Sequence, residues 1–148
     1  MSSQPLPRLT PEQYLATGRR AGYKSEYFGG QTFAMSGAIR EHNLIASHFN
    51  RIIGAQVVGR DCEVYFGDMR VLVSQSGLYT YPDASVVCGQ PRFLDTHVDT
   101  LLNPTLLVEI LSPSTESYDR GKKAEHYRTI PSLQQYVLIA QDYPHVEL

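Results

Sequence analysis

The chain has 148 residues, enough for one domain with its own hydrophobic core. Hydrophobic residues make up 42% and charged residues 19%, a globular composition that excludes wholesale disorder. The net charge of −2 lacks the basic excess typical of nucleic-acid-binding domains, so a site for a polyanion must be local or use a metal cation. With no membrane-length apolar run and no apolar signal stretch in residues 1–8, we expect a cytoplasmic protein without a membrane segment.

The chain contains two cysteines, Cys62 and Cys88. Two cysteines alone build neither a disulfide framework nor a zinc ribbon. Buried thiols are therefore the simplest expectation, and a redox or metal-binding pair is the alternative.

The N-terminal end predicts a loose tail over residues 1–9, followed by a helix. Thr10 is a helix-capping residue, Pro11 suits the first helical position, and Gln13 completes a capping box with the threonine. The helix is expected to end by Gly22.

Hydrophobic periodicity predicts the remaining elements. Apolar residues recur at helical spacing over 38–58, and 105–111 is a nearly continuous apolar run typical of a strand covered on both faces. The other expected elements are strands at 24–28, 31–36, 62–66, 69–74, 83–88, 133–140 and from 146, a loop at 89–103, and a helix at 116–129. This order predicts a single α/β (α+β) domain over 10–148 with a mixed central β-sheet. Because the chain stops where a strand begins, we expect a C-terminal truncation.

Two acidic residues are unusual because they adjoin apolar strands. Glu109 lies within the most hydrophobic strand, where an unpaired carboxylate costs several kcal/mol. Asp83 follows a Tyr-Pro pair and enters an apolar run. A glutamate that reaches solvent or an arginine, and a turn aspartate beside proline, are the alternatives. Together the two acids predict a Mg²⁺ site, since carboxylate oxygens are natural ligands of this ion.

The expected C-terminal helix carries a second group of polar residues. Asp119, Lys123 and Tyr127 follow at intervals of four and therefore share one face. An exposed ion pair is the alternative. Gly121 indicates either close backbone approach or a helix that starts later.

The sequence leaves the roles of Glu26 and His42 open between two alternatives each. Glu26 is either an exposed strand residue or a third acid facing the same site. His42 lies on the apolar face of the 38–58 helix and is either a core histidine or a ligand. P-loop, GxGxxG, GxSxG and HExxH motifs are absent.

Several segments have a recognisable order and spacing. They are 33–38, 41–45, 67–70, 79–83, 103–106, 108–115, 119–121, Lys123 with Tyr127, and 130–133. Together they resemble the Uma family, which is classed with the restriction endonucleases of the PD-(D/E)xK nuclease superfamily, and the likeness runs from about Leu9 to the end. The resemblance implies a restriction-endonuclease-like fold with a mixed sheet flanked by helices. The chain departs from the family at 29–31, where Gly-Gly-Gln replaces the usual Asp-Gly-Glu.

The resemblance also implies site residues. Asp83 with the proline before it would be the PD of the superfamily name, and Glu109 would be the D/E position. The usual lysine would fall at Leu111, where none is present. In families of this kind the following helix supplies the lysine, which points to Lys123 rather than its neighbour Lys122.

These residues predict a metal-dependent endonuclease that hydrolyses phosphodiester bonds in nucleic acid, with DNA as the expected substrate. Asp83 and Glu109, with the backbone carbonyl of Ile110, would hold Mg²⁺ or Mn²⁺. Lys123 would orient or help deprotonate the attacking water and offset charge in the transition state.

The remaining predicted roles support this centre. Tyr127 would position Lys123 or a phosphate oxygen, and Glu26, which matches an acidic position of the family, would hold a metal-bound water. A double-stranded substrate favours a homodimer, with one site for each strand. The alternative is a catalytically silent member of the fold that serves as a nucleic-acid or protein interaction module.

Overall fold

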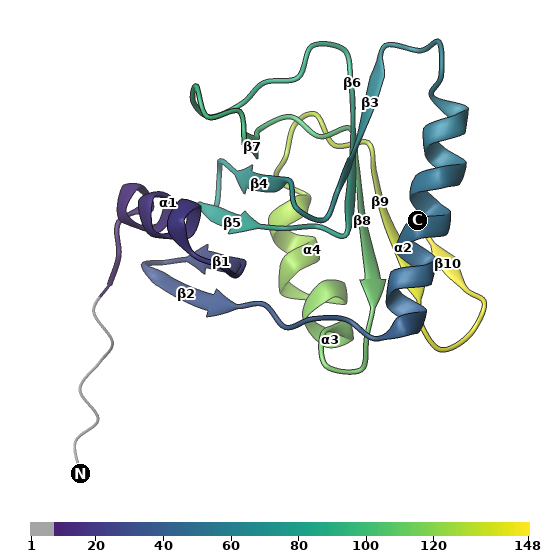
Figure 1. Cartoon of the computed structure of the whole chain (residues 1–148), viewed down its shortest axis with the longest axis horizontal. Coiled ribbons are helices and arrows are strands. Elements are labelled where there is room, and N and C mark those ends of the chain that lie inside the picture. Colours follow the sequence, from purple (N-terminus) through teal and green to yellow (C-terminus); the bar gives the residue numbers. More distant parts are fainter. Residues whose placement is uncertain (1–7) are drawn as a thin grey trace.

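The computed structural model describes residues 8–148 and contains four helices and ten strands in that range (Figure 1). The helices are α1 (Pro11–Arg20), α2 (Arg40–Gln56), α3 (Glu116–Arg120) and α4 (Lys122–Tyr127). The strands are β1 (Ser25–Phe28), β2 (Gln31–Ala34), β3 (Cys62–Phe66), β4 (Arg70–Val73), β5 (Leu78–Thr80), β6 (Ala84–Cys88), β7 (Thr100–Leu101), β8 (Leu106–Leu111), β9 (Gln135–Ala140) and β10 (Val146–Glu147). None of these helices has both the length and the apolar character needed to cross a membrane.

The strands form two five-stranded sheets. The first has the order β2-β1-β5-β4-β7, and the second has the order β10-β9-β8-β6-β3. Each sheet contains one parallel pair, β4 with β7 and β8 with β9, among antiparallel neighbours. The predicted α/β (α+β) class with mixed strand pairing is therefore confirmed, with the strands divided between two sheets.

The start of the described chain is tied to the first sheet. Thr10 and Gln13 form the predicted capping box: Thr10 Oγ1 accepts from the backbone of Gln13 at 3.2 Å, and Gln13 Oε1 accepts from that of Thr10 at 2.8 Å. Just before the helix, the backbone of Leu9 donates to the carbonyl of Gly30 at 2.9 Å. Leu9 is therefore not loose, and residues 1–7 of the predicted tail lie outside the described residues.

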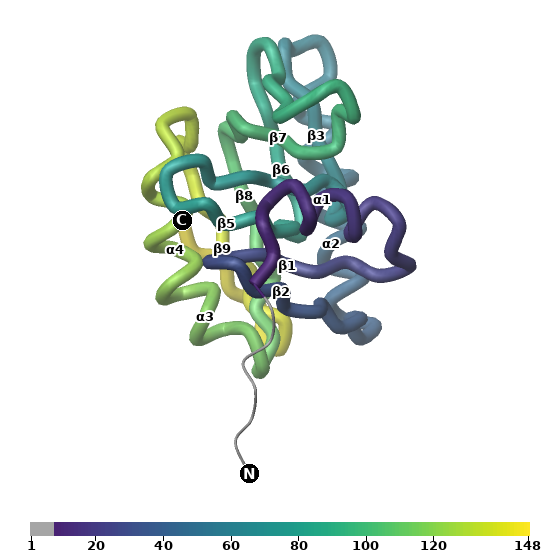
Figure 2. Tube along the Cα trace, turned by 90° about the vertical axis from the view of Figure 1, so that its left-hand side faces the viewer, coloured from purple at the N-terminus to yellow at the C-terminus, as the bar shows by residue number. Residues whose placement is uncertain are grey.

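The helices cover different parts of the two sheets (Figures 1 and 2). α1 packs on β1, α2 packs on β3 and β8, and α3 packs on β8. Figure 1 shows α3 and α4 beside the place where the two sheets meet. One hydrophobic cluster contains residues of both sheets and of α4, namely Val71, Val73, Leu78, Val87, Leu107 and Tyr127. This shared core fixes the position of α4 relative to both sheets.

Two strands and one helix break differ from the prediction. β5 and β7 were not predicted, because three and two residues are too few to show an alternating pattern. The predicted helix at 116–129 is wrong as one continuous element, because Gly121 (φ −100°, ψ −101°) separates α3 from α4. A Cβ atom at Gly121 would stand only 3.0 Å from the carbonyl oxygen of Ser117. Glycine, which has no Cβ atom, permits this close approach of the backbone.

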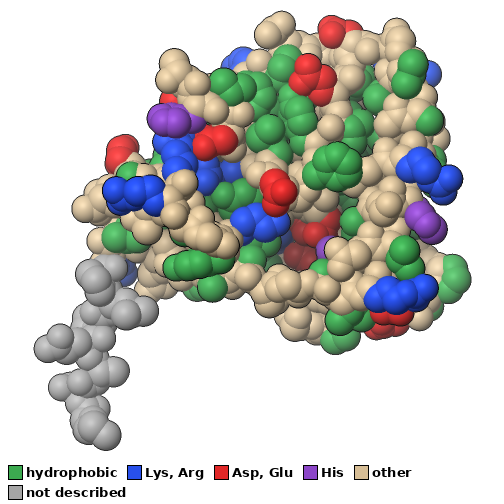
Figure 3. All heavy atoms as spheres, viewed as in Figure 1, with side chains coloured by type: hydrophobic (Ala, Val, Ile, Leu, Met, Phe, Trp, Pro, Cys, Tyr) green, Lys and Arg blue, Asp and Glu red, His purple; other side chains and the backbone are tan. Residues whose placement is uncertain are grey.

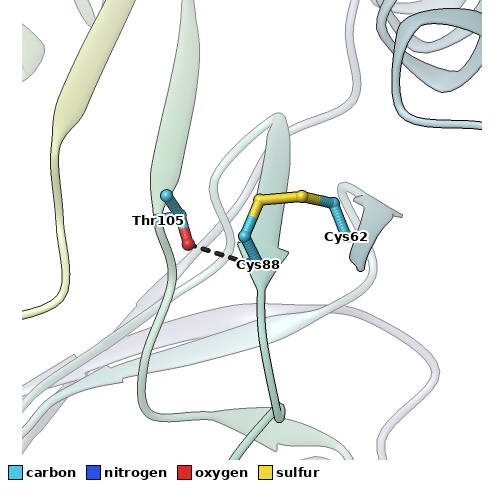
Figure 4. The surroundings of a disulfide bond; sticks show 3 residues. All are labelled: Cys62, Cys88 and Thr105. Atoms are coloured by element: carbon cyan, nitrogen blue, oxygen red, sulfur yellow. Dashed lines mark hydrogen bonds between the residues drawn. A yellow bond between two sulfur atoms is a disulfide. The ribbon is translucent and has the colours of Figure 1, made fainter. Parts of the chain in front are cut away.

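The expectation of two buried thiols is also wrong. Cys62 and Cys88 are joined by a disulfide bond (Figure 4). The antiparallel pairing of β3 with β6 places them directly opposite one another, with their Cα atoms 4.0 Å apart. Cys88 is exposed, and its backbone N–H donates to Thr105 Oγ1 at 2.9 Å. The bond therefore links the edge strand β3 to the interior strand β6.

Reduction of this disulfide is expected to lower the free energy of unfolding by about 3–4 kcal/mol, because the bond closes a loop of moderate length in the unfolded chain. The two cysteines are 26 positions apart in the sequence. Urea unfolding with and without dithiothreitol measures the difference, and the Cys62→Ala/Cys88→Ala variant, which should not respond to the reductant, is the control. Equal stability of the oxidised and reduced protein would contradict this expectation.

Candidate active site

Acidic side chains from both sheets meet around one buried lysine. Glu26 comes from β1, Glu109 from β8, and Asp119 and Lys123 from α3 and α4. Figure 3 shows acidic, basic and histidine side chains gathered near the middle of the face it displays, over the region between the sheets. One N-terminal strand and three neighbouring C-terminal elements therefore supply one cluster.

Glu109 lies in the interior of the second sheet. Its strand pairs with β6 on one side and β9 on the other, and the residue is only 4% exposed. The hydroxyl of Tyr127 donates to Glu109 Oε1 at 2.8 Å, and Lys123 Nζ lies 2.9 Å from the same oxygen. Burial raises the pKa of Glu109 to about 8, against the opposing effect of Lys123. The unusual carboxyl group within an apolar strand is thus buried and has two polar partners.

Lys123 is the buried cation at the centre of the cluster. Its Nζ lies 2.9 Å from Glu109, 3.3 Å from Glu26 Oε1 and 3.8 Å from Asp119 Oδ1. Burial alone would lower the pKa of Lys123, but the neighbouring carboxylates outweigh burial and raise it. The lysine is therefore held as an ammonium. The alternative of an exposed ion pair with Asp119 is wrong, since both residues are buried.

Asp83 adjoins Glu109 through the backbone of β8. Its Oδ2 accepts from the N–H of Ile110 at 2.7 Å, and its own N–H donates to the carbonyl of Val108 at 3.0 Å. His42 Nε2, from α2, lies 3.2 Å from Asp83 Oδ1. This contact with Asp83 raises the pKa of His42. The Asp83 carboxylate is therefore oriented by groups from two other elements.

Glu26 faces the cluster and is therefore not an exposed strand residue. Thr80 Oγ1 of β5 donates to Glu26 Oε1 at 2.8 Å, and Lys123 contacts the same oxygen. Its side chain is only 13% exposed. Glu26 is thus a third acid beside the two predicted from the apolar strands.

The sequence prediction gave no role in the site to two contributors, Asp119 and Thr80. Asp119 is buried, and burial raises its pKa to about 6. The four-residue spacing between Asp119 and Lys123 could have indicated that Asp119 belongs to the site. Thr80 gave no signal, because its strand is too short to recognise. The structure also leaves Lys122 exposed and Leu111 buried, so of these three positions only Lys123 brings an ammonium to the cluster.

The donor chemistry of the site fits a small divalent cation. Within residues 8–148 no three His, Cys, Asp or Glu side chains lie close enough together to hold a metal ion by themselves. Mg²⁺ binds through one or two carboxylates and keeps several waters, so a larger set of side chains is not required. Asp83, Glu109 and the carbonyl of Ile110 offer oxygen donors of the type that Mg²⁺ and Mn²⁺ prefer.

Comparison with known proteins agrees with this architecture. Residues 11–148 match the model of the Uma2 family, described as "Putative restriction endonuclease". The chain is 38% identical over 146 residues to the uncharacterized protein slr1290 of Synechocystis sp., covering 99% of this chain and 76% of the relative. It is 36% identical over 133 residues to sll1609 of the same organism, covering 90% and 75%.

A solved structure shows the same fold. The crystal structure of a "putative nuclease belonging to DUF820" from Anabaena variabilis superposes with a TM-score of 0.73 at 21% identity. The match covers 94% of this chain and 83% of the Anabaena chain. The resemblance read from the sequence motifs is confirmed by the family model: the chain belongs to the Uma2 family.

Proposed function

We propose that this protein is a metal-dependent endonuclease that hydrolyses phosphodiester bonds in nucleic acid, with DNA as its substrate. The observation that carries the proposal is the buried contact between Lys123 and Glu109 at 2.9 Å, beside Asp83. The descriptions of the family and of the Anabaena structure support the same class of reaction.

Asp83 and Glu109 would hold Mg²⁺ or Mn²⁺ together with the backbone carbonyl of Ile110. When bound, such an ion polarises the phosphate and lowers the pKa of a coordinated water. The protein's own contribution is orientation. The N–H of Ile110 and the ring of His42 fix the Asp83 carboxylate. Because these partners belong to β8 and α2, the carboxylate is set before substrate arrives.

Lys123 supplies the positive charge of the site. Its ammonium would donate hydrogen bonds to the attacking water or to a phosphate oxygen and so offset negative charge that develops in the transition state. Tyr127 holds Glu109 through its hydroxyl, and Glu26 holds Lys123 from the side of the first sheet. Glu26 would also accept a hydrogen bond from a metal-bound water.

A nicking assay tests the proposal directly. Supercoiled plasmid and single-stranded DNA are incubated with the protein in Mg²⁺, Mn²⁺ or EDTA, and we expect cleavage with either ion and none with EDTA. The exposed Lys122→Ala variant is the matched control and should cleave like the wild type. A folded wild-type protein that cleaves neither substrate would contradict the proposal and favour a non-catalytic interaction module.

A further inference from the structure

We propose that Lys24 binds a backbone phosphate of the nucleic acid and so places the strand against the acidic cluster. The inference rests on the proposed nuclease function and adds a substrate-binding residue to it. Lys24 immediately precedes β1 and takes no part in the contacts of Lys123 described above.

The position of Lys24 in the chain directs it toward the site. Residues two apart in an extended segment point to the same side of the sheet. Lys24 is two residues before Glu26, which contacts Lys123 at 3.3 Å. Both side chains therefore lie on the side of β1 that faces the cluster.

Contacts around Gly67 bring the Lys24 ammonium close to the backbone of Asp83. Lys24 Nζ donates to the carbonyl oxygen of Gly67 at 3.1 Å. A Cβ atom at Gly67 would stand 3.9 Å from Lys24 Nζ and 3.6 Å from the carbonyl oxygen of Asp83. The Lys24 ammonium and the Asp83 carbonyl therefore both lie next to Gly67.

The ring of Tyr81, two residues before Asp83, supports the ammonium. Lys24 Nζ lies 5.5 Å from the ring centroid. The guanidinium carbon of buried Arg70 lies 5.4 Å from that centroid. An aromatic face attracts a cation and restricts its position.

Lys24 is accessible and easily exchanges its present partner. Its side chain is 41% exposed, and its ion-pair partner Asp68, 3.2 Å away, is 93% exposed. An ion pair in water is screened and weak, so a phosphate can replace Asp68 with little loss. Lys123, in contrast, is enclosed by three carboxylates. Lys24 is therefore an accessible cation beside the cluster that can hold a phosphate flanking the reacting one.

A cation is needed beside this site because the site itself is rich in acidic residues. The site contains four acidic residues, Glu26, Asp83, Glu109 and Asp119. A nucleic acid strand also carries one negative charge per phosphate, so the two repel one another unless cations lie between them. Contacts to phosphates fix the register and orientation of a bound strand. A cation at the border of the cluster would hold a flanking phosphate while the scissile phosphate meets the metal and Lys123.

The salt dependence of DNA binding tests the role of Lys24. The wild type, Lys24→Met, Lys24→Arg and the exposed-lysine control Lys122→Met are titrated against a fluorescent DNA duplex by anisotropy, with Ca²⁺ in place of Mg²⁺ to limit cleavage. Each phosphate contact contributes about 0.9 to the slope of log affinity against log salt. We expect Lys24→Met to lose about 0.9 of this slope and to bind roughly fivefold to tenfold more weakly near 0.1 M salt.

Lys24→Arg should restore the slope, and Lys122→Met should keep it. In cleavage assays, Lys24→Met should raise KM more than it lowers kcat, because the residue holds the substrate strand. If the wild type binds and cleaves DNA but Lys24→Met keeps the wild-type slope, this inference is wrong and the nuclease proposal stands. If the wild type neither binds nor cleaves DNA, the nuclease proposal fails, and the role of Lys24 fails with it.

Discussion

Glu109→Gln is expected to lower the rate of DNA cleavage by about 10³-fold or more while leaving the fold intact. A metal ligand contributes several kcal/mol to the transition state, and about 1.4 kcal/mol corresponds to a tenfold change in rate. Glutamine has nearly the same shape as glutamate, and its Oε1 can still accept from Tyr127 and Lys123, as Glu109 Oε1 does. The variant therefore removes the ionisable carboxyl group that we propose as a metal ligand, without opening a cavity.

Single-turnover cleavage of a labelled duplex measures the rate, and thermal unfolding measures the fold. Because burial raises the pKa of Glu109 to about 8, the neutral amide is tolerated at this position and a large loss of stability is not expected. The structural control is Glu63→Gln, at an exposed residue of the edge strand β3, which should retain the wild-type rate. Cleavage by Glu109→Gln at the wild-type rate would show that this carboxylate is not a metal ligand.

Lys123→Met is expected to lower the free energy of unfolding by about 3–5 kcal/mol, in addition to its effect on cleavage. Methionine fills a similar volume but leaves the buried carboxyl groups of Glu26, Glu109 and Asp119 without their cation. Removing one partner of a buried ion pair is costly for this reason. Urea unfolding measures the loss, and Lys122→Met, at an exposed neighbour, should change stability by less than about 0.5 kcal/mol.

The loss is expected to depend on pH in a defined direction. The pKa values of Glu109 and Asp119 are raised to about 8 and about 6, and loss of the ammonium raises them further. As the pH falls through this range these acids become neutral and no longer need a cation, so the deficit of Lys123→Met should shrink. Above this range Glu109 is ionised, and there the combination of Lys123→Met with Glu109→Gln should recover part of the loss. A deficit that stays constant with pH would indicate a packing defect instead.

The sequence was most informative where one residue contradicted its surroundings. Glu109 in an apolar strand was such a case, because a buried charge needs a partner and the structure provides two. The regular spacing of apolar residues also located α2, and the capping box located the start of α1. These signals are local, so they can be read without knowledge of the fold.

The missed features depend on contacts between distant segments. Cys62 and Cys88 pair only because β3 and β6 align in one register, which nothing near either cysteine specifies. In the same way, His42 reaches Asp83 only through the packing of α2 on the second sheet. The glycine at position 121 indicated that the helix could break there. The close approach of its backbone to the carbonyl oxygen of Ser117 became visible only in the structure.

The location of the cluster has a consequence for how this protein tolerates mutation. Glu26 belongs to the first sheet and Glu109 to the second, and Lys123 contacts both. Many enzymes carry their reactive residues on loops, where sequence can change with little effect on the scaffold. Here the same side chains hold the two sheets together and would perform the chemistry. Substitutions that remove the Lys123 ammonium would therefore alter cleavage and folding together. A tolerated substitution at Lys123 would have to meet both demands at once.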